Sequence, residues 1–171
     1  MKKTFFLAAL LIGLMVCAGG HSDSEYLTSI GRVAPQLYIK SAEDSIALDE
    51  LRGNYVLVNF WNSVDAVSRR DANLYTAWLR RHPGSDLRLV GINFDESEGL
   101  FNEIVRLDNL EATQQHHVSG ELAKTIIDSY SLGDGYGSVL ISPGGKIIAH
   151  NPTDEDLDAL FAKRDPRRSG Q

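Results

Sequence analysis

The chain has 171 residues, of which 43% are hydrophobic and 23% are charged. This balance excludes a fully disordered chain and predicts one domain with its own core, since domains commonly run to ~100–150 residues. The formal net charge of −6 argues against general nucleic-acid binding, because phosphate backbones attract basic proteins. The one cysteine, Cys17, excludes an internal disulfide, a redox pair of cysteines and a cysteine-built zinc site.

The first 20 residues have the layout of a secretory signal peptide. Lys2 and Lys3 give a basic start, and Thr4 to Val16 is an uncharged, mostly apolar run that is too short for a membrane-spanning helix of ~20 residues. Small residues follow the run. We therefore expect export to the periplasm or to the outer face of a bacterial envelope membrane, with residues 21–32 as a polar tether.

Two fates of Cys17 stay open. The sequence Leu14-Met15-Val16-Cys17 resembles a bacterial lipobox, in which the cysteine becomes the lipidated first residue, although Val16 is bulkier than the small residue preferred there. Ordinary cleavage after Ala18 or Gly20 would instead release a soluble protein. A lipid anchor on Cys17 is the one membrane attachment that we expect.

The rest of the chain predicts a domain over residues 33–163 and a polar tail at 164–171. In chain order, the expected elements are an edge strand at Gln36–Lys40, a turn at Ala42–Ser45, an apolar segment at Ile46–Leu51, a central strand at Tyr55–Trp61, a helix at Asp65–Arg81, a strand at Asp86–Phe94, a helix marked by Leu100, Phe101, Ile104 and Leu107, a short strand at Gln114–Val118, a helix at Glu121–Tyr130, a hairpin of Gly137–Ser142 and Lys146–His150, and a helix from a Thr153/Asp156 cap to about Lys163.

Strands that alternate with helices predict parallel pairing, and the hairpin adds an antiparallel pair. The fold class is therefore α/β, with a central mixed β-sheet and helices on both faces. Several apolar residues are expected to face inward: Val56, Val58, Phe60, Leu89, Ile92, Val139 and Ile141 in the sheet, Leu74, Tyr75, Trp78 and Leu79 in the first long helix, and Leu122, Ile126 and Ile127 in the third.

Five segments in order resemble the thioredoxin superfamily. They are Ala34-Pro35, Leu48 to Gly53, Tyr55 to Trp61, Val90 to Asp95, and Leu140 to Ile147. The chain is most similar to the exported thiol-disulfide oxidoreductases of the TlpA/ResA type, next to the AhpC/TSA redoxins. The resemblance implies a thioredoxin-like sandwich, and Trp61 should lie near the family's active-site surface.

The residues of the family's active site are replaced. Asp65 and Ser68 stand at the two cysteine positions, at what we expect to be the exposed start of a helix, and no proline occurs near Tyr136, where the family has its cis-proline. Disulfide exchange needs a thiolate and a second, resolving thiol, which a carboxylate and a hydroxyl cannot replace. We therefore assign no catalytic residue. Asp65 should cap the helix, and the peptide bond before Tyr136 should be trans.

The resemblance still implies a groove that binds extended polypeptide in active relatives. Its candidate residues here are Trp61, Asn62, Val64, Asp65, Ser68, Gly135, Tyr136 and Gly137. We expect a non-catalytic binding or accessory module for an unidentified envelope protein or peptide, with no cofactor. The alternatives are a redox protein that uses a partner's thiols and an unrelated enzyme that uses Asp65, Ser68 and His116.

Three further features favour structural explanations. His116 and His117 should point to opposite faces of a strand, so a shared metal is not expected and solvated side chains are. A triad of Ser68, His116 and Asp65 has no nucleophile elbow to support it. The glycine-rich segment 133–137 is expected to be a flexible loop, and Arg69, Arg70, Arg80 and Arg81 should form a solvated basic flank, with an anion or partner site as the alternative.

Overall fold

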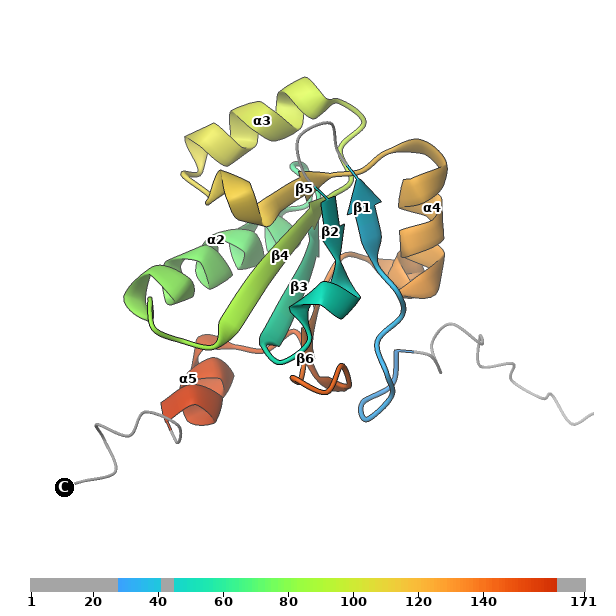
Figure 1. Cartoon of the computed structure of the whole chain (residues 1–171). Helices are drawn as coiled ribbons and strands as arrows, with labels where there is room; N and C mark the ends of the chain where they lie inside the picture. Colours follow the sequence, from blue (N-terminus) through green and yellow to red (C-terminus); the bar gives the residue numbers. More distant parts are fainter. Residues whose placement is uncertain (1–27, 41–44, 163–171) are drawn as a thin grey trace, which may run out of the picture.

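The computed structural model describes residues 28–40 and 45–162, built around one five-stranded sheet of order β5-β4-β3-β6-β7 (Figure 1). Its strands are β3 (Tyr55–Trp61), β4 (Leu87–Asn93), β5 (Gln115–His117), β6 (Ser138–Ile141) and β7 (Ile147–His150). The pairs β3–β4 and β4–β5 are parallel, whereas β3–β6 and β6–β7 are antiparallel. The predicted mixed sheet and terminal hairpin are confirmed. The signal peptide, most of the tether, Ala42 to Asp44 in the expected turn, and the tail lie outside the described residues.

Strand β3 lies at the centre of the sheet, and all of its residues are buried. Its alternating Val, Leu and aromatic side chains meet apolar residues on both faces, which explains why the run YVLVNFW has no polar side as an exposed strand would. All seven sheet residues that were expected in the core are buried, from Val56 to Ile141.

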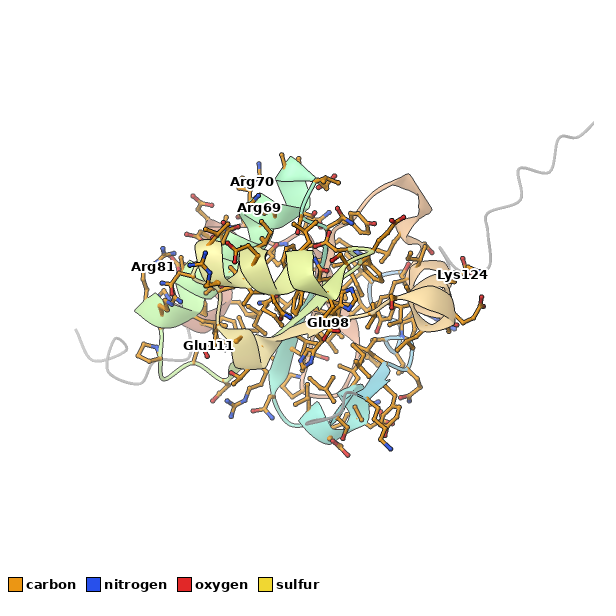
Figure 2. All side chains as sticks on the ribbon, turned by 90° about the horizontal axis from the view of Figure 1, so that it is seen from above. Arg69, Arg70, Arg81, Glu98, Glu111 and Lys124 are labelled. Atoms are coloured by element: carbon orange, nitrogen blue, oxygen red, sulfur yellow. The ribbon has the colours of Figure 1, made fainter. Side chains whose placement is uncertain are left out.

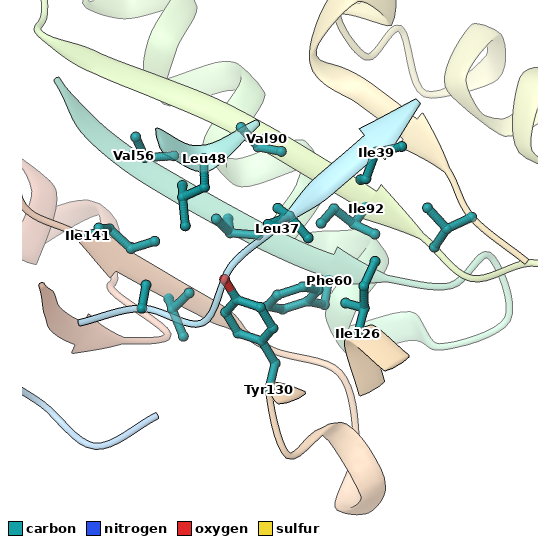
Figure 3. Close-up of a cluster of buried hydrophobic side chains, with 14 of the residues drawn as sticks. Leu37, Ile39, Leu48, Val56, Phe60, Val90, Ile92, Ile126, Tyr130 and Ile141 are labelled. Atoms are coloured by element: carbon teal, nitrogen blue, oxygen red, sulfur yellow. The ribbon is translucent and has the colours of Figure 1, made fainter. Parts of the chain in front are cut away.

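Helices cover both faces of the sheet, as predicted. One face packs against α4 (Gly120–Ser129), the small β1–β2 sheet (Tyr38–Lys40 and Ser45–Ala47) and the 3-10 helix η1 (Leu48–Leu51); Figure 3 shows Phe60, Ile92 and Ile126 in this cluster. The other face packs against α2 (Ala66–Arg81), α3 (Glu98–Leu107) and α5 (Asp154–Ala162). The residues Thr153 and Asp156 cap α5 reciprocally, as expected.

Three expectations about individual elements need correction. Strand β1 pairs with β2 alone, so it is not an edge of the main sheet. In α3 the inward residues are Phe101, Ile104 and Val105, whereas Leu100 and Leu107 are exposed. Leu122 of α4 is exposed as well. Helical spacing identifies an apolar stripe. When a helix has more apolar residues than one stripe can hold, the elements packed against it determine which of them are buried.

Within residues 28–40 and 45–162, no helix combines the length and apolar character that crossing a bilayer requires.

Candidate functional site

The site lies where two parallel strands end side by side. Trp61 and Asn93 are register partners at the carboxyl ends of β3 and β4, so the loops that follow them leave the sheet together. Carboxyl ends of parallel strands are where α/β sheets place their binding residues. The polar residues after β3 and β4 therefore meet, although more than 30 positions separate Asn62 from its contact, the carbonyl of Phe94.

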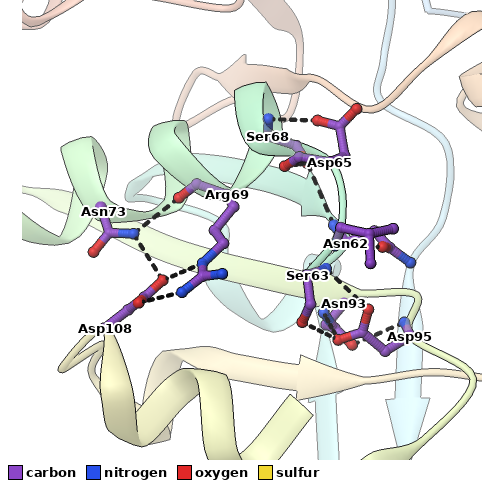
Figure 4. Close-up of polar contacts among 10 residues, drawn as sticks. Asn62, Ser63, Asp65, Ser68, Arg69, Asn73, Asn93, Asp95 and Asp108 are labelled. Atoms are coloured by element: carbon purple, nitrogen blue, oxygen red, sulfur yellow. Dashed lines mark hydrogen bonds and ion pairs between the residues drawn. The ribbon is translucent and has the colours of Figure 1, made fainter. Parts of the chain in front are cut away.

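Asp65 caps α2, as the sequence predicts. Its Oδ1 accepts a hydrogen bond of 2.7 Å from the backbone N–H of Ser68, and its backbone is extended, as an N-cap residue requires (Figure 4). Hydrogen bonds from Ser68 hold the pKa of the Asp65 carboxyl below its usual value. A permanent anion therefore occupies the first cysteine position.

Ser68 is not exposed, contrary to the expectation for the helix start. Only 1% of the residue is accessible, because its side chain points under the preceding loop. Its Oγ accepts from the N–H of Asn62 and donates to the carbonyl of Asp65, each at 3.3 Å. Ser68 thus ties the loop to the helix, and neither of these bonds involves a histidine, as the triad would require.

A second carboxylate, which sequence reasoning missed, lies beneath this loop. Asp95 is 3% exposed and follows β4. Its side chain accepts bonds from the Ser63 N–H at 2.9 Å, from the Ser63 hydroxyl and from Asn93 Nδ2 at 3.0 Å (Figure 4). One feature of the sequence could have identified Asp95. It follows a buried strand that is expected to lie parallel to the strand before Ser63, and the carboxyl ends of such strands meet at one edge of the sheet.

Tyr136 forms the other side of the site, in the segment before β6. Its ring stacks on Phe94 with centroids 5.5 Å apart, and no cis peptide bond occurs in the described residues, which agrees with the predicted trans bond. Burial raises the pKa of the Tyr136 phenol, and the negative charges of Asp65 and Asp95 raise it further, against a hydrogen bond from Asn62. The charges of both carboxylates therefore act on the ionisation of the Tyr136 hydroxyl.

Gly135 and Gly137, on either side of Tyr136, are each explained by a different feature of the structure. Gly135 has φ of 139°, which side-chain-bearing residues rarely adopt, and it ends the 3-10 helix η3 (Leu132–Asp134). A Cβ on Gly137 would lie 2.7 Å from Oδ1 of Asn151, while its carbonyl accepts from the Phe60 N–H at 2.9 Å. The expected flexible loop is thus a short 3-10 helix followed by a segment bonded to β3.

Of the remaining candidate residues, Trp61 is buried and Val64 is exposed. Trp61 is fully buried and its Nε1–H donates to Gln115 Oε1 at 3.0 Å, so it lies beneath the site. Val64 is 87% exposed and Val67, which we did not predict, is 56% exposed. One feature of the sequence could have identified Val67. It is the one larger apolar residue in a first helical turn whose other residues are small or polar.

Three of the four arginines in the expected solvated basic flank, Arg70, Arg80 and Arg81, are exposed, whereas Arg69 is half-buried. Each of the four also has a hydrogen-bond or ion-pair partner. Arg69 donates two bonds to Asp108, at 2.6 and 2.7 Å, and Arg70 pairs with Asp71. At the far end of α2, Arg81 pairs with Asp154 and Arg80 donates to the Asn109 carbonyl. Figure 2 shows Arg81 well apart from Arg69 and Arg70. These contacts give no support to an anion site.

The two adjacent histidines serve different sides of the sheet. His117 donates from Nε2 to the Asp95 carbonyl at 2.7 Å and lies against Phe101. His116 is paired with Ile92, a residue of the opposite core. Both are half-buried rather than solvated. In the part of the chain that the structure describes, no group of three His, Cys, Asp or Glu residues could hold a metal ion.

Solved structures with the same architecture are thioredoxin-like. A thioredoxin-like protein from Parabacteroides distasonis has 31% sequence identity and a TM-score of 0.65, over 79% of this chain and 96% of that one. The thioredoxin domain of a thiol-disulfide oxidoreductase from Bacteroides vulgatus has 22% identity, a TM-score of 0.68 and the same coverages. A thiol:disulfide interchange protein from a Bacteroides species has 22% identity and a TM-score of 0.68, over 80% of this chain and 90% of that one.

No protein-family model and no curated protein matches the sequence. The first structural relative nevertheless shares 31% identity and is covered over nearly its whole length. The chain belongs to the thioredoxin-like proteins of the thioredoxin superfamily.

Proposed function

We propose that this protein is a non-catalytic thioredoxin-like module that binds extended polypeptide at the start of α2. The observation on which this proposal rests is the chemistry at positions 65 and 68. Asp65 is an ionised helix cap and Ser68 is a buried hydroxyl, and neither can form or resolve a mixed disulfide.

The surface around these positions supports binding. We define the Val64 surface as Val64, Asp65, Val67 and Tyr136. Two of its four members are exposed valines, at 87% and 56%, three positions apart at the start of α2. Exposed apolar residues that are grouped, rather than scattered singly, are typical of interaction sites. A surface of this kind suits an aliphatic side chain from a partner.

The backbone of Tyr136 supports the same proposal. Within the described residues, no hydrogen bond engages its N–H or its C=O, whereas the next carbonyl, of Gly137, is bonded to β3. An extended peptide that runs beside this segment could pair with both groups, as in recognition by strand addition.

The finer family and location are part of the proposal. The motifs quoted above favour the exported TlpA/ResA type, and two of the similar structures are thiol-disulfide exchange proteins by name. We propose export to the bacterial envelope, with a lipid on Cys17 or cleavage after Ala18 or Gly20. Mass spectrometry of the mature N-terminus distinguishes the two fates, and an intact Met1 would contradict both.

Two assays test the proposed function. In an insulin-reduction assay with dithiothreitol, we expect no turnover above background, and turnover would favour the alternative that uses a partner's thiols. Binding of capped, extended valine-containing peptides should be measured by chemical-shift perturbation. We expect shifts at the Val64 surface that are lost in Val64→Ser/Val67→Ser and kept in the matched control Leu100→Ser/Leu107→Ser, which changes two exposed leucines of α3.

A further inference from the structure

The Val64 surface combines apolar side chains with an uncompensated negative charge. Val64 precedes Asp65 and Val67 follows it by two positions, so both exposed valines lie within one helical turn of the carboxylate. Asp65 is only partly buried, and its hydrogen bonds from Ser68 keep it ionised. The surface is therefore not a neutral apolar patch.

Neighbouring cations do not neutralise this charge. Arg69 and Arg70 lie in the first two turns of α2, but their guanidinium groups are bonded to Asp108 and Asp71. Figure 4 shows Arg69 directed away from α2, toward Asp108 and not toward Asp65. Both arginines are therefore committed to carboxylates outside the Val64 surface.

Additional acidic groups lie on the same side of the molecule. Asp95 holds a second carboxylate below Ser63, and the exposed Glu96 and Glu98 follow it in the chain. Burial is the main cause of the raised pKa of the Tyr136 phenol, and the charges of Asp65 and Asp95 add to it. The chain as a whole has a net charge of −6. An incoming acidic segment is repelled and a basic one attracted.

We propose that the occupant of the Val64 surface is an extended polypeptide segment that carries lysine or arginine two positions from an aliphatic residue, so that both side chains face the surface. The aliphatic side chains contact Val64 and Val67, a cationic side chain reaches the Asp65 carboxylate, and the peptide backbone pairs with Tyr136. This inference rests on the proposed function and specifies the class of partner.

Three capped peptides of equal length and equal valine content test the charge preference. Each peptide places its valines and its test residues two positions apart, on one face of the extended chain, and the test residues are lysine, glutamine or glutamate. Titration calorimetry measures Kd at low salt. We expect the lysine peptide to bind about three- to tenfold more tightly than the glutamine peptide, and the glutamate peptide to bind most weakly, as partly screened ion pairs allow. Raising the salt to about 0.5 M should remove most of the difference.

The variant Asp65→Asn isolates the carboxylate, since asparagine caps helices about as well as aspartate. It should reduce the lysine preference to about twofold or less. The matched control is Asp49→Asn, which makes the same charge change in η1, near the opposite end of β3, and should leave the preference unchanged.

The possible outcomes separate the inference from the proposed function. Equal affinities for all three peptides, with binding still lost in Val64→Ser/Val67→Ser, would overturn the charge preference and leave polypeptide binding intact. An equal effect of the two asparagine variants would also overturn it, because net charge alone would then explain the preference. Absence of binding by any peptide would contradict both.

Discussion

The two ends of α2 differ in how they are held. At the carboxyl end, Trp78 is fully buried, donates from Nε1 to Asp158 at 2.9 Å, and stacks with His82 at 4.1 Å between ring centroids. At the amino end, hydrogen bonds that Ser68 donates to Asp65 replace apolar packing, and Val64 and Val67 remain exposed. The carboxyl end therefore contributes mainly to stability, whereas the amino end leaves apolar surface available for contact.

The largest expected effect is on the carboxyl end. Trp78→Ala should lower the free energy of unfolding by ~3–5 kcal/mol, because it empties a fully buried site that joins α2 to α5. Urea denaturation followed by circular dichroism measures this. Trp78→Phe, which keeps an aromatic ring but lacks the N–H, should cost less. Equal losses would contradict a packing role.

The next effect concerns the Arg69–Asp108 pair, which fastens the first turn of α2 to the end of α3. Arg69→Met should cost ~1–3 kcal/mol, because Asp108 loses two charge-assisted hydrogen bonds. Arg70→Met is the matched control, since Arg70 pairs at the exposed surface with its neighbour Asp71, and should cost about 1 kcal/mol or less.

The same pair predicts a pH dependence. The hydrogen bonds from Arg69 hold the pKa of Asp108 below its usual value, so their contribution is fully present above the unfolded aspartate value of ~4. The contribution is lost as pH falls through the lower folded value. Urea midpoints between about pH 2 and 5 should therefore decline less steeply in Arg69→Met than in the parent chain. Parallel slopes would contradict the assignment.

A smaller effect on stability is expected when cysteines are introduced at the amino end. Asp65→Cys with Ser68→Cys should fold with a loss of ~0.5–2 kcal/mol from the missing cap. It should show little insulin reduction, because Gly135 and Tyr136 present a backbone different from that implied for active relatives. Adding Tyr136→Pro tests this directly. Full activity in the double variant alone would mean that only the thiols are missing.

The smallest effect on stability is expected at Val64. Val64→Ser should change the free energy of unfolding by less than about 0.5 kcal/mol, because the side chain is 87% exposed. It should nevertheless weaken peptide binding measurably. A variant that loses stability without losing binding would reverse the contrast between the two ends of α2.

Local patterns in the sequence determined most of the fold. The apolar run of β3, the turn residues of the hairpin and the alternation of strands with helices predicted a mixed sheet with the correct core, because burial on both faces leaves a continuous apolar run in the chain. The position of Asp65 before an amphipathic helix likewise predicted its role as a cap. Lack of a second cysteine excluded intramolecular disulfide exchange without any structure.

Tertiary structure decided which polar groups meet. The contacts of Ser63 with Asp95 and of Arg69 with Asp108 join residues 32 and 39 positions apart, and no local periodicity specifies such pairs. It also decided that Ser68 is buried, that Val67 is exposed, and that Leu100 and Leu107 face outward. A helical pattern fixes which side chains share a face, but the side of a helix that is buried depends on the elements packed against it.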